Sequence, residues 1–541
     1  MSDPTCERSD RLDWALLLPA SVELPFDEVL VLGGTDRRGQ SLVDHGLAAA
    51  WRRPTGPADR GSFVVAWEDC PVDVERIAGH VGAGGLLYLE IDRRRPGRRR
   101  LGPRSLRRAL ARSGRFIFSA HLVTPDLDRP SRYLPIDHPR AIRWHLRSLF
   151  IAGTPITRAV QCCLSAVLAT PLAGVALRLV SVRYMVIATQ ADDQSSPLGD
   201  PMGRGGERAV LVTSGYDQAS RAVVLPFQRG GRVPRFAVKV ASSSTTTIGT
   251  QREHERLISL HASLPAHTAR AVPTPIGIFA LADRTACVQS YAPGPSMSAT
   301  VGGWGRTLSA KCRDLDVVVD WLTKFAAETR VIGVTAERDW TVIFGEATAA
   351  IDFPPEVVDF LVEAEKTASA MALGDSAVHQ HYDAGPWNVH LDGAEPMLID
   401  WETDDLRPTD CLGPPLADVL YLVTYWYFLA SRAESEDDEE AAIVRLFAPL
   451  VPADAAVVAA RAAIDAALVG LGVERQAVPA LLAALWAERA VYTRRRRADL
   501  GFPMETGRSR PEAYLRALAG AMPTMCAPDG WWALALGTQP R

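Results

Sequence analysis

Short apolar runs alternate with stretches of mixed polarity along the first 145 residues. The apolar runs lie at 29–33, 62–67 and 86–91, and stretches with helical spacing lie between them at 42–51 and 72–81. Strands that alternate with helices are typical of a parallel α/β sheet, because a crossover helix must carry the chain back to the start of the next parallel strand. We therefore expect a tail at 1–20 and an α/β domain at 21–145.

A stretch without charged residues follows at 159–177. It is just long enough to span a bilayer. Polar residues and Pro171 interrupt this stretch, and Arg158 and Arg178 flank it. We therefore favour a buried or interfacial segment over a spanning helix, and membrane association through 159–177 is the less favoured alternative.

The pattern changes after residues 191–208, which are rich in Gly, Pro, Ser and Asp and predict a linker. Strand-like runs then lie at 209–213, 222–227 and 235–240, and the chain is mainly helical from about residue 306. This pattern predicts an α+β region after the linker. The bounds that we expect are a hydrophobic segment and linker at 146–204, a strand-rich lobe at 205–295, a helical lobe at 296–430 and a helical C-terminal subdomain at 431–541.

The composition narrows the class of protein. Apolar residues make up 47% and charged residues 23% of the 541 residues, as in ordinary globular proteins. The net charge of −4 argues against a nucleic-acid partner. The eight cysteines are scattered and show no metal-ligand spacing, which fits free thiols in a cytoplasmic protein. Since the chain has only four lysines, Lys239 in an apolar strand stands out.

The segment 379–405 carries the candidate chemistry. It contains His381-x-Asp383, then Asn388, then Asp400 at the end of a short apolar run. Phosphoryl transfer needs positioning and charge neutralisation more than covalent help. Asp383 can accept or orient the proton of an attacking hydroxyl. Asn388 and Asp400 offer the hard oxygen ligands that Mg2+ prefers, and a hairpin between them would bring both to one ion.

A second half-site is expected upstream, in the strand-rich lobe. The charge of Lys239 would offset the phosphates of ATP, and such a lysine needs a carboxylate partner. Glu253, which opens the following helix, is favoured for this role, and Glu255 is the competing candidate. The turn that begins at Ser214 and Gly215 could cover the phosphates with its backbone N–H groups, although its single glycine makes it weak evidence alone.

Together these elements resemble the aminoglycoside phosphotransferase and choline kinase family, which has a protein-kinase-like fold. The resemblance covers about residues 205–430 and is specific because its elements occur in order at workable spacings. The matching elements are the V-K strand at Val238–Lys239, the R-E-x-x-x-L helix start at Arg252–Leu257, the hinge Gln289–Gly294, H-x-D-x-x-P-W-N at His381–Asn388, I-D-W-E at Ile399–Glu402 and P-L-A-D at Pro415–Asp418.

The resemblance implies a bilobal kinase-like domain with a helical extension, and it assigns roles in nucleotide binding, catalysis, metal binding and support. The residues implied for ATP are Lys239, Glu253, Gln289, Ser290, Tyr291, Ser214 and Gly215. The implied catalytic residue is Asp383, the implied Mg2+ ligands are Asn388 and Asp400, and the implied structural residues are His381 and Asp418. The sequence departs from the family pattern at Tyr382, where glycine usually follows the histidine, and in its glycine-poor nucleotide loop.

The α/β domain at 21–145 weakly resembles a class I methyltransferase with a truncated Rossmann-like fold. The turn at Gly33–Gly39 lacks the G-x-G spacing that lets backbone approach a ligand, and no acidic residue clearly ends a second strand. We therefore favour a degenerate domain with a docking or regulatory role.

These observations predict an ATP- and Mg2+-dependent small-molecule kinase that phosphorylates a hydroxyl group. The acceptor would be of the aminoglycoside, sugar or amino-alcohol class. The alternatives are a non-catalytic nucleotide-binding or scaffold pseudokinase and a bifunctional methyltransferase–kinase. The sequence identifies neither the acceptor nor the oligomeric state.

Overall fold

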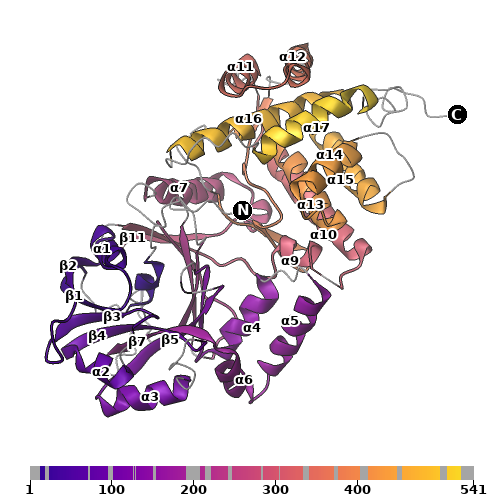
Figure 1. The fold of residues 1–541 in the computed structure, drawn as a ribbon. Helices are drawn as coiled ribbons and strands as arrows, with labels where there is room; N and C mark the ends of the chain where they lie inside the picture. The colour runs from indigo at the N-terminus through magenta and orange to yellow at the C-terminus, as the bar shows by residue number, and fades with distance from the viewer. Residues whose placement is uncertain are drawn as a thin grey trace. The chain divides into compact units, whose positions relative to one another are not determined.

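The computed structural model of the chain divides into two compact units (Figure 1). The first comprises Met1–Arg147, Ala159–Gln251 and Pro275–Tyr291, and the second Ser148–Arg158, Arg252–Thr274 and Ala292–Arg541. The residues that the structure describes are 12–18, 24–70, 73–94, 102–125, 127, 130–149, 154–189, 208–213, 221–228, 230–241, 247–281, 284–303, 305–332, 340–370, 376–401, 412–447, 454–499 and 509–525.

One large sheet forms the first unit. Its strands are β1 (Phe26–Leu32), β2 (Ala48–Arg52), β3 (Gly61–Ala66), β4 (Val81–Asp92), β5 (Phe116–Thr124), β6 (Arg132–Pro135), β7 (Arg183–Thr189), β8 (Arg208–Val212), β9 (Ala222–Phe227), β10 (Ala237–Val240), β11 (Pro275–Leu281) and β12 (Arg284–Gln289). They lie side by side in the order β11-β12-β10-β9-β8-β6-β5-β7-β4-β3-β1-β2.

The sheet has a parallel part and an antiparallel part. β2, β1, β3 and β4 run parallel to one another. From β4 to β11 every neighbouring pair is antiparallel. The parallel pairing predicted for the start of the chain is therefore confirmed for β1, β3 and β4, and β2 adds a fourth parallel strand that was not predicted.

The sheet continues past the predicted linker. β6 pairs with β8 through Arg132 opposite Val212 and Tyr133 opposite Leu211. Strands that precede residues 191–208 and strands that follow them thus share backbone hydrogen bonds within one unit. The linker itself lies mostly outside the described residues, and the expected domain bounds stay a prediction.

The helix predicted at 42–51 is wrong after residue 44. α1 (Asp36–Asp44) ends early, and the apolar residues that follow form β2, parallel to β1. Gly46 lies between these elements at φ 68°. This left-handed conformation, which glycine adopts without strain, ends a helix and turns the chain into the strand.

Five further helices accompany the strands of this part of the chain, within the described residues. They are α2 (Val74–Gly79), α3 (Pro103–Arg112), α4 (Pro139–Ser148), α5 (Pro155–Val167) and α6 (Ala173–Val180). The central strands are buried on both faces, as the run Tyr184–Ala188 in β7 shows with no exposed side chain. Burial on both faces needs continuous apolar runs, which explains why these strands show little alternation in the sequence.

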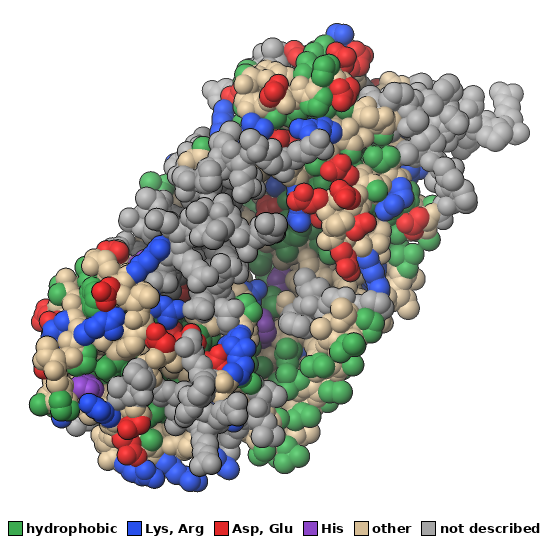
Figure 2. Space-filling view, viewed as in Figure 1, with side chains coloured by type: hydrophobic (Ala, Val, Ile, Leu, Met, Phe, Trp, Pro, Cys, Tyr) green, Lys and Arg blue, Asp and Glu red, His purple; other side chains and the backbone are tan. Residues whose placement is uncertain are grey.

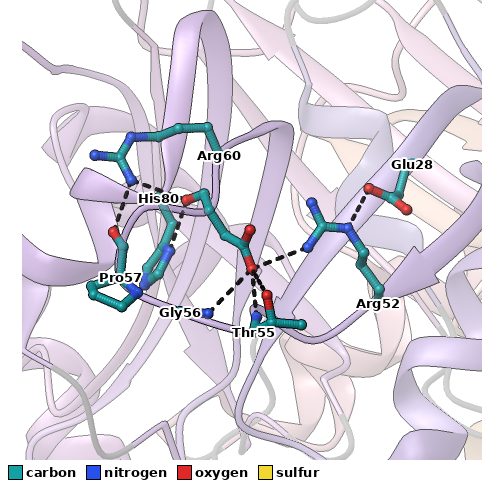
Figure 3. A network of polar contacts seen from close by, with 8 residues as sticks. Glu28, Arg52, Thr55, Gly56, Pro57, Arg60 and His80 are labelled. Carbon is teal, nitrogen blue, oxygen red and sulfur yellow. Dashed lines mark hydrogen bonds and ion pairs between the residues drawn. The ribbon is translucent and has the colours of Figure 1, made fainter.

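A polar network fixes the connection between β2 and β3 (Figure 3). Arg52 donates to Glu28 at 2.6 Å and to the Asp59 carboxylate at 3.3 Å. That carboxylate also accepts from the hydroxyl of Thr55 at 2.9 Å, and His80 Nδ1 contacts the Asp59 carbonyl at 3.0 Å. These side-chain hydrogen bonds therefore hold the connection between β2 and β3 in place.

The second unit is mainly helical. Its described helices are α7 (Thr247–Ser263, which begins in the first unit), α8 (Ala266–Ala269), α9 (Met297–Val301), α10 (Leu308–Glu328), α11 (Trp340–Ala350), α12 (Pro355–Ala370), α13 (Ala417–Ser431), α14 (Glu436–Phe447), α15 (Ala455–Leu471), α16 (Val478–Asp499) and α17 (Arg510–Met525). Its short strands are β13 (Val331–Ile332), β14 (Ser376–His379), β15 (Val389–Asp392), β16 (Glu395–Leu398) and β17 (Leu412–Gly413).

Large aromatic side chains fill the core of this unit. Trp401, Trp426, Trp486 and Tyr427 are fully buried, and α13 is buried around most of its circumference. A helix that is apolar on all sides belongs in the middle of a bundle. Across the described residues, no single helix meets the length and polarity needed to cross a bilayer, although the bent pair Ala455–Leu471 and Arg475–Arg495 does by those two measures together.

Candidate active site

The predicted catalytic segment forms a loop followed by a hairpin in the second unit. The loop follows β14, and β15 then pairs antiparallel with β16 around a turn that contains Gly393 at φ 65°. The backbone N–H of Ile399 donates to the Asn388 carbonyl at 2.8 Å. The expected hairpin is therefore confirmed, and it brings the chain next to Asn388 immediately before Asp400.

Four side chains surround the carboxylate of Asp383. Its Oδ2 accepts from Asn388 Nδ2 at 2.8 Å and from Trp387 Nε1 at 3.2 Å. Its Oδ1 accepts from the Tyr421 hydroxyl at 2.9 Å, and Arg489 Nη1 lies 3.7 Å from the same oxygen. The Asp383 side chain is still 32% exposed. The carboxylate is therefore fixed in orientation and open to a ligand.

His381 supports the loop through two hydrogen bonds and through packing of its ring. Its Nδ1 accepts from the Asp383 backbone N–H at 3.3 Å, so the proton is on Nε2, which donates to the Ile399 carbonyl at 2.8 Å. The ring is fully buried and packs against Trp401, with 4.5 Å between ring centroids. This geometry fits the structural role predicted for His381.

Asp418, at the start of α13, holds the backbone of the same loop. Its Oδ2 accepts from the His381 N–H at 2.6 Å and its Oδ1 from the Tyr382 N–H at 3.0 Å. Tyr382 has φ 66°, a conformation that costs most residues energy, and its hydroxyl donates to the Leu412 carbonyl at 2.8 Å. Burial raises the pKa of the Asp418 carboxyl to about 6.

Asn388 and Asp400 fit a magnesium ion by the chemistry of their donors. Asn388 uses its Nδ2 to donate to the Asp383 carbonyl at 2.9 Å and to the Asp383 carboxylate, which leaves the amide oxygen to coordinate a cation. Mg2+ binds through one or two carboxylates and keeps its waters and the substrate phosphates. Across the described part of the chain, no group of three or more His, Cys, Asp or Glu could hold a metal, and this ion does not require one.

Residues 212–452 match the model of the phosphotransferase enzyme family. The resemblance to the aminoglycoside phosphotransferase family is thereby confirmed. The enzyme class that it implied, a phosphotransferase with an alcohol group as acceptor, is confirmed with it. No curated protein matches the chain.

Two solved aminoglycoside phosphotransferases resemble part of the chain. The enzyme APH(3'')-Id from Streptomyces rimosus, solved with ADP and streptomycin, is 14% identical with a TM-score of 0.30, over 49% of this chain and 90% of that one. An aminoglycoside-3'-phosphotransferase of type VIII is 18% identical with a TM-score of 0.24, over the same shares of the two chains.

The structure also places the residues that the phosphotransferase resemblance implied for the nucleotide. Lys239 is buried in β10, between β9 and β12, in the first unit. In α7, Glu253 is fully buried and Glu255 is exposed. A buried carboxylate needs a partner, whereas an exposed one does not, which favours Glu253 over Glu255 as a functional acid.

The hinge residues lie at the end of β12. Gln289 is buried, and its backbone pairs with Ala237 on one side and Pro275 on the other. Ser290 and Tyr291 follow the strand and complete the first unit. The remaining predicted phosphate-binding residues, Ser214 and Gly215, lie outside the described residues.

Sequence reasoning missed two neighbours of Asp383, Tyr421 and Arg489. An aromatic run such as the one that contains Tyr421 is typical of a helix core, which holds for Trp426 but not for the Tyr421 hydroxyl. Asp418 and Tyr421 are three residues apart on α13, so they lie on the same face of the helix. Because Asp418 contacts the catalytic loop, Tyr421 must also face that loop. Arg489 left no such signal, because it lies beyond the matched family region, on α16.

Proposed function

We propose that this chain is an ATP-dependent kinase that transfers the γ-phosphate to a hydroxyl group of a small acceptor. The observation that carries the proposal is the hydrogen bond from the Tyr421 hydroxyl to Asp383 Oδ1 at 2.9 Å. It demonstrates that this oxygen can accept from a neutral hydroxyl. A carboxylate oxygen has two lone pairs, so an acceptor hydroxyl can bind at the second one while Tyr421 keeps the first.

The contacts of the other Asp383 oxygen, Oδ2, support this proposal. Asn388 and Trp387 donate to Oδ2, which restricts rotation of the carboxylate and leaves Oδ1 as the oxygen that an acceptor hydroxyl would contact. Arg489 Nη1 lies 3.7 Å from Oδ1 and places a positive charge beside this oxygen. An ordered base of this kind contributes by positioning the nucleophile and taking its proton.

Bound magnesium and ATP would supply the phosphoryl group and neutralise its charge. Asn388 and Asp400 would hold the metal, and Lys239 would contact the phosphates with Glu253 as its acid. Backbone groups at Gln289, Ser290 and Tyr291 would hold the adenine. ATP use also fits the cytoplasmic location expected from the cysteines.

The test uses the full chain with ATP, Mg2+ and a panel of sugars, amino-alcohols and aminoglycosides. ADP release identifies turnover, and mass spectrometry identifies the phosphorylated acceptor. We expect Asp383→Asn to lower kcat by roughly 100- to 10,000-fold, the usual contribution of an acid–base group. The matched control is Asp392→Asn, an exposed aspartate at the end of β15, which should leave kcat unchanged.

Two outcomes would contradict the proposal. If Asp383→Asn and the wild type release ADP equally on every acceptor, Asp383 is not the base. If Mg-ATP raises the melting temperature but no acceptor is phosphorylated, the protein binds nucleotide without transferring phosphate; saturation at 100 times Kd would add about 2.7 kcal/mol of stability.

We infer that the α/β part of the first unit is a degenerate Rossmann-like domain without its own cofactor. Such domains bind a cofactor at the turn after the first strand. Here the turn is occupied by the chain itself: the Gly34 N–H donates to Asp69 at 2.6 Å, and the Gly34 carbonyl accepts from Arg53 at 3.0 Å. A Cβ at Gly34 would also lie 2.3 Å from the Trp67 ring.

The bifunctional methyltransferase–kinase alternative predicts binding of S-adenosylmethionine by this part of the chain. Since the backbone groups of the turn are already paired, we expect titration of the full chain with S-adenosylmethionine in a calorimeter to give no binding heat. A saturable signal at one site per chain would show that the domain is functional.

A further inference from the structure

The outward side of α5 and α6 is apolar where a surface helix is normally polar. Val160 is 60% exposed, Leu172 66% and Val175 48%, and Cys163 and Val167 are also exposed. We call these five residues the apolar face. Hydrophobic side chains gather over α5 and α6 at the lower right of the molecule in Figure 2.

The spacing along α5 separates this face from the side that packs on the protein. Val160, Cys163 and Val167 recur at helical intervals on the exposed side. Gln161 is buried on the opposite side and donates through Nε2 to the Leu146 carbonyl of α4. The helix therefore directs a polar residue inward and apolar residues outward, the reverse of a helix that faces water.

The charged residues of the segment that carries the apolar face are arginines, one of which, Arg183, pairs with Asp92 of β4 at 3.3 Å. Between His138 and Ala191 the chain has no Asp or Glu, and it has six arginines. Arg93 lies next to the end of α6. Its backbone N–H donates to the Val182 carbonyl at 2.9 Å, and its side chain donates to the Ser181 carbonyl at 3.2 Å. On α3, Arg104, Arg107 and Arg108 are exposed, and Arg112 pairs with Glu75 of α2 at 2.6 Å.

The lengths of the two helices exclude a spanning arrangement. At 1.5 Å per residue, the 13 residues of α5 extend about 20 Å and the 8 residues of α6 about 12 Å. The hydrocarbon core of a bilayer is about 30 Å thick. Helices of these lengths lie in the interface with their apolar side in the acyl region.

We propose that the apolar face docks this protein on an anionic lipid surface. The exposed valines and Leu172 enter the interface, and the arginines attract the acidic headgroups. A second copy of the chain is a poorer occupant, because a symmetric contact would bring the arginines of the two copies toward one another. The proposal does not depend on the kinase activity.

The test is sedimentation of the full chain with sucrose-loaded vesicles. One preparation is phosphatidylcholine alone, and the other contains about one-third phosphatidylglycerol. We expect binding to the anionic vesicles that weakens as salt is raised from 0.1 to 0.5 M, because salt screens the arginines. Leu172→Asp and, on the other helix, Val160→Asp should each lower the partition coefficient at least tenfold without changing the melting temperature.

Two controls separate the apolar and electrostatic parts. The double change of Arg107 and Arg108 to Gln should weaken binding to anionic vesicles several-fold. Val469→Asp, at an apolar residue 85% exposed on α15, should leave binding unchanged. The proposal is overturned if the wild type sediments with neither vesicle or equally with both, or if Leu172→Asp binds like the wild type. It is also overturned if sedimentation equilibrium shows a dimer that Leu172→Asp converts to a monomer.

Discussion

Replacing Asp418 by asparagine should leave the fold almost as stable as before and yet remove most of the catalytic activity. The Asp418 carboxylate accepts two backbone N–H groups, those of His381 and Tyr382. The amide of asparagine offers one oxygen, so one of these N–H groups would face an NH2 group instead. The change keeps the volume of the side chain and alters only its hydrogen bonding and charge.

The stability terms nearly cancel at pH 8. The unpaired N–H costs about 1–3 kcal/mol. Against this, burial raises the pKa of the Asp418 carboxyl from 3.8 to about 6, so keeping it ionised costs the wild type about 3 kcal/mol, a net value that already includes its two backbone hydrogen bonds. The unfolding free energies should therefore agree within about 2 kcal/mol.

The pH dependence follows from the sign of this shift. Because the folded-state pKa is raised, the wild type gains stability as the pH falls from above 6 toward 3.8, and the variant lacks this gain. Between pH 8 and pH 5, the difference in unfolding free energy should move in favour of the wild type by about 1 kcal/mol. Urea unfolding at the two pH values measures this change.

The loss of activity has a geometric cause. Tyr382, at φ 66°, precedes Asp383 directly, and its unfavourable backbone conformation is held by the bond to Asp418. Without that bond the loop should relax, and a displacement of about 1 Å at a catalytic group costs roughly 100-fold in rate. Steady-state ADP release should show this drop in kcat, with Asp392→Asn as the unchanged control. Wild-type kcat in Asp418→Asn would refute the reasoning.

Three further changes test separate parts of the structure. Burial raises the pKa of the Glu90 carboxyl from 4.5 to about 8. The unfolding free energy of the wild type should therefore fall between pH 5 and pH 8 relative to that of Glu90→Gln, by at most about 5 kcal/mol. Urea unfolding measures this, and the same pH dependence in both proteins would argue against it. Arg489→Met should lower kcat about tenfold, since Arg489 donates to the Tyr421 hydroxyl at 3.0 Å and lies 3.7 Å from its ring centroid; unchanged kinetics would exclude a positioning role. Gly385→Ala would place a Cβ 2.3 Å from the Trp387 ring, and should shift tryptophan emission and raise the acceptor KM, whereas an unshifted spectrum would show that the ring has room.

The local part of the candidate site was predictable because it is compact in sequence. His381, Asp383, Asn388 and Asp400 lie within a loop and one hairpin, so their spacing alone sets which backbone groups meet. Contacts made by helices that are distant in sequence were not predictable. Arg489 reaches Asp383 from α16, and its position depends on helix packing that leaves no pattern in the loop sequence.

The fold shows the same division between local and distant information. Apolar runs predicted strands such as β1, β3 and β4 because burial on both faces imposes an uninterrupted apolar composition. The change from helix to strand after α1 occurs at Gly46, and the strand that follows is completed by its pairing with β1. Pairing of β6 with β8 joins segments far apart in the chain, and neither strand carries a signal that identifies its partner.

The pairing of β6 with β8 also determines where the chain can be divided into separate proteins. A protein that began at residue 205 would leave one side of β8 as an exposed edge, with unpaired N–H and C=O groups open to any other strand. The phosphotransferase half would then be expected to aggregate during expression, even though all its matched family elements remain. The two halves of the chain are therefore expected to fold together, because strands of the first half complete the sheet that β8 enters.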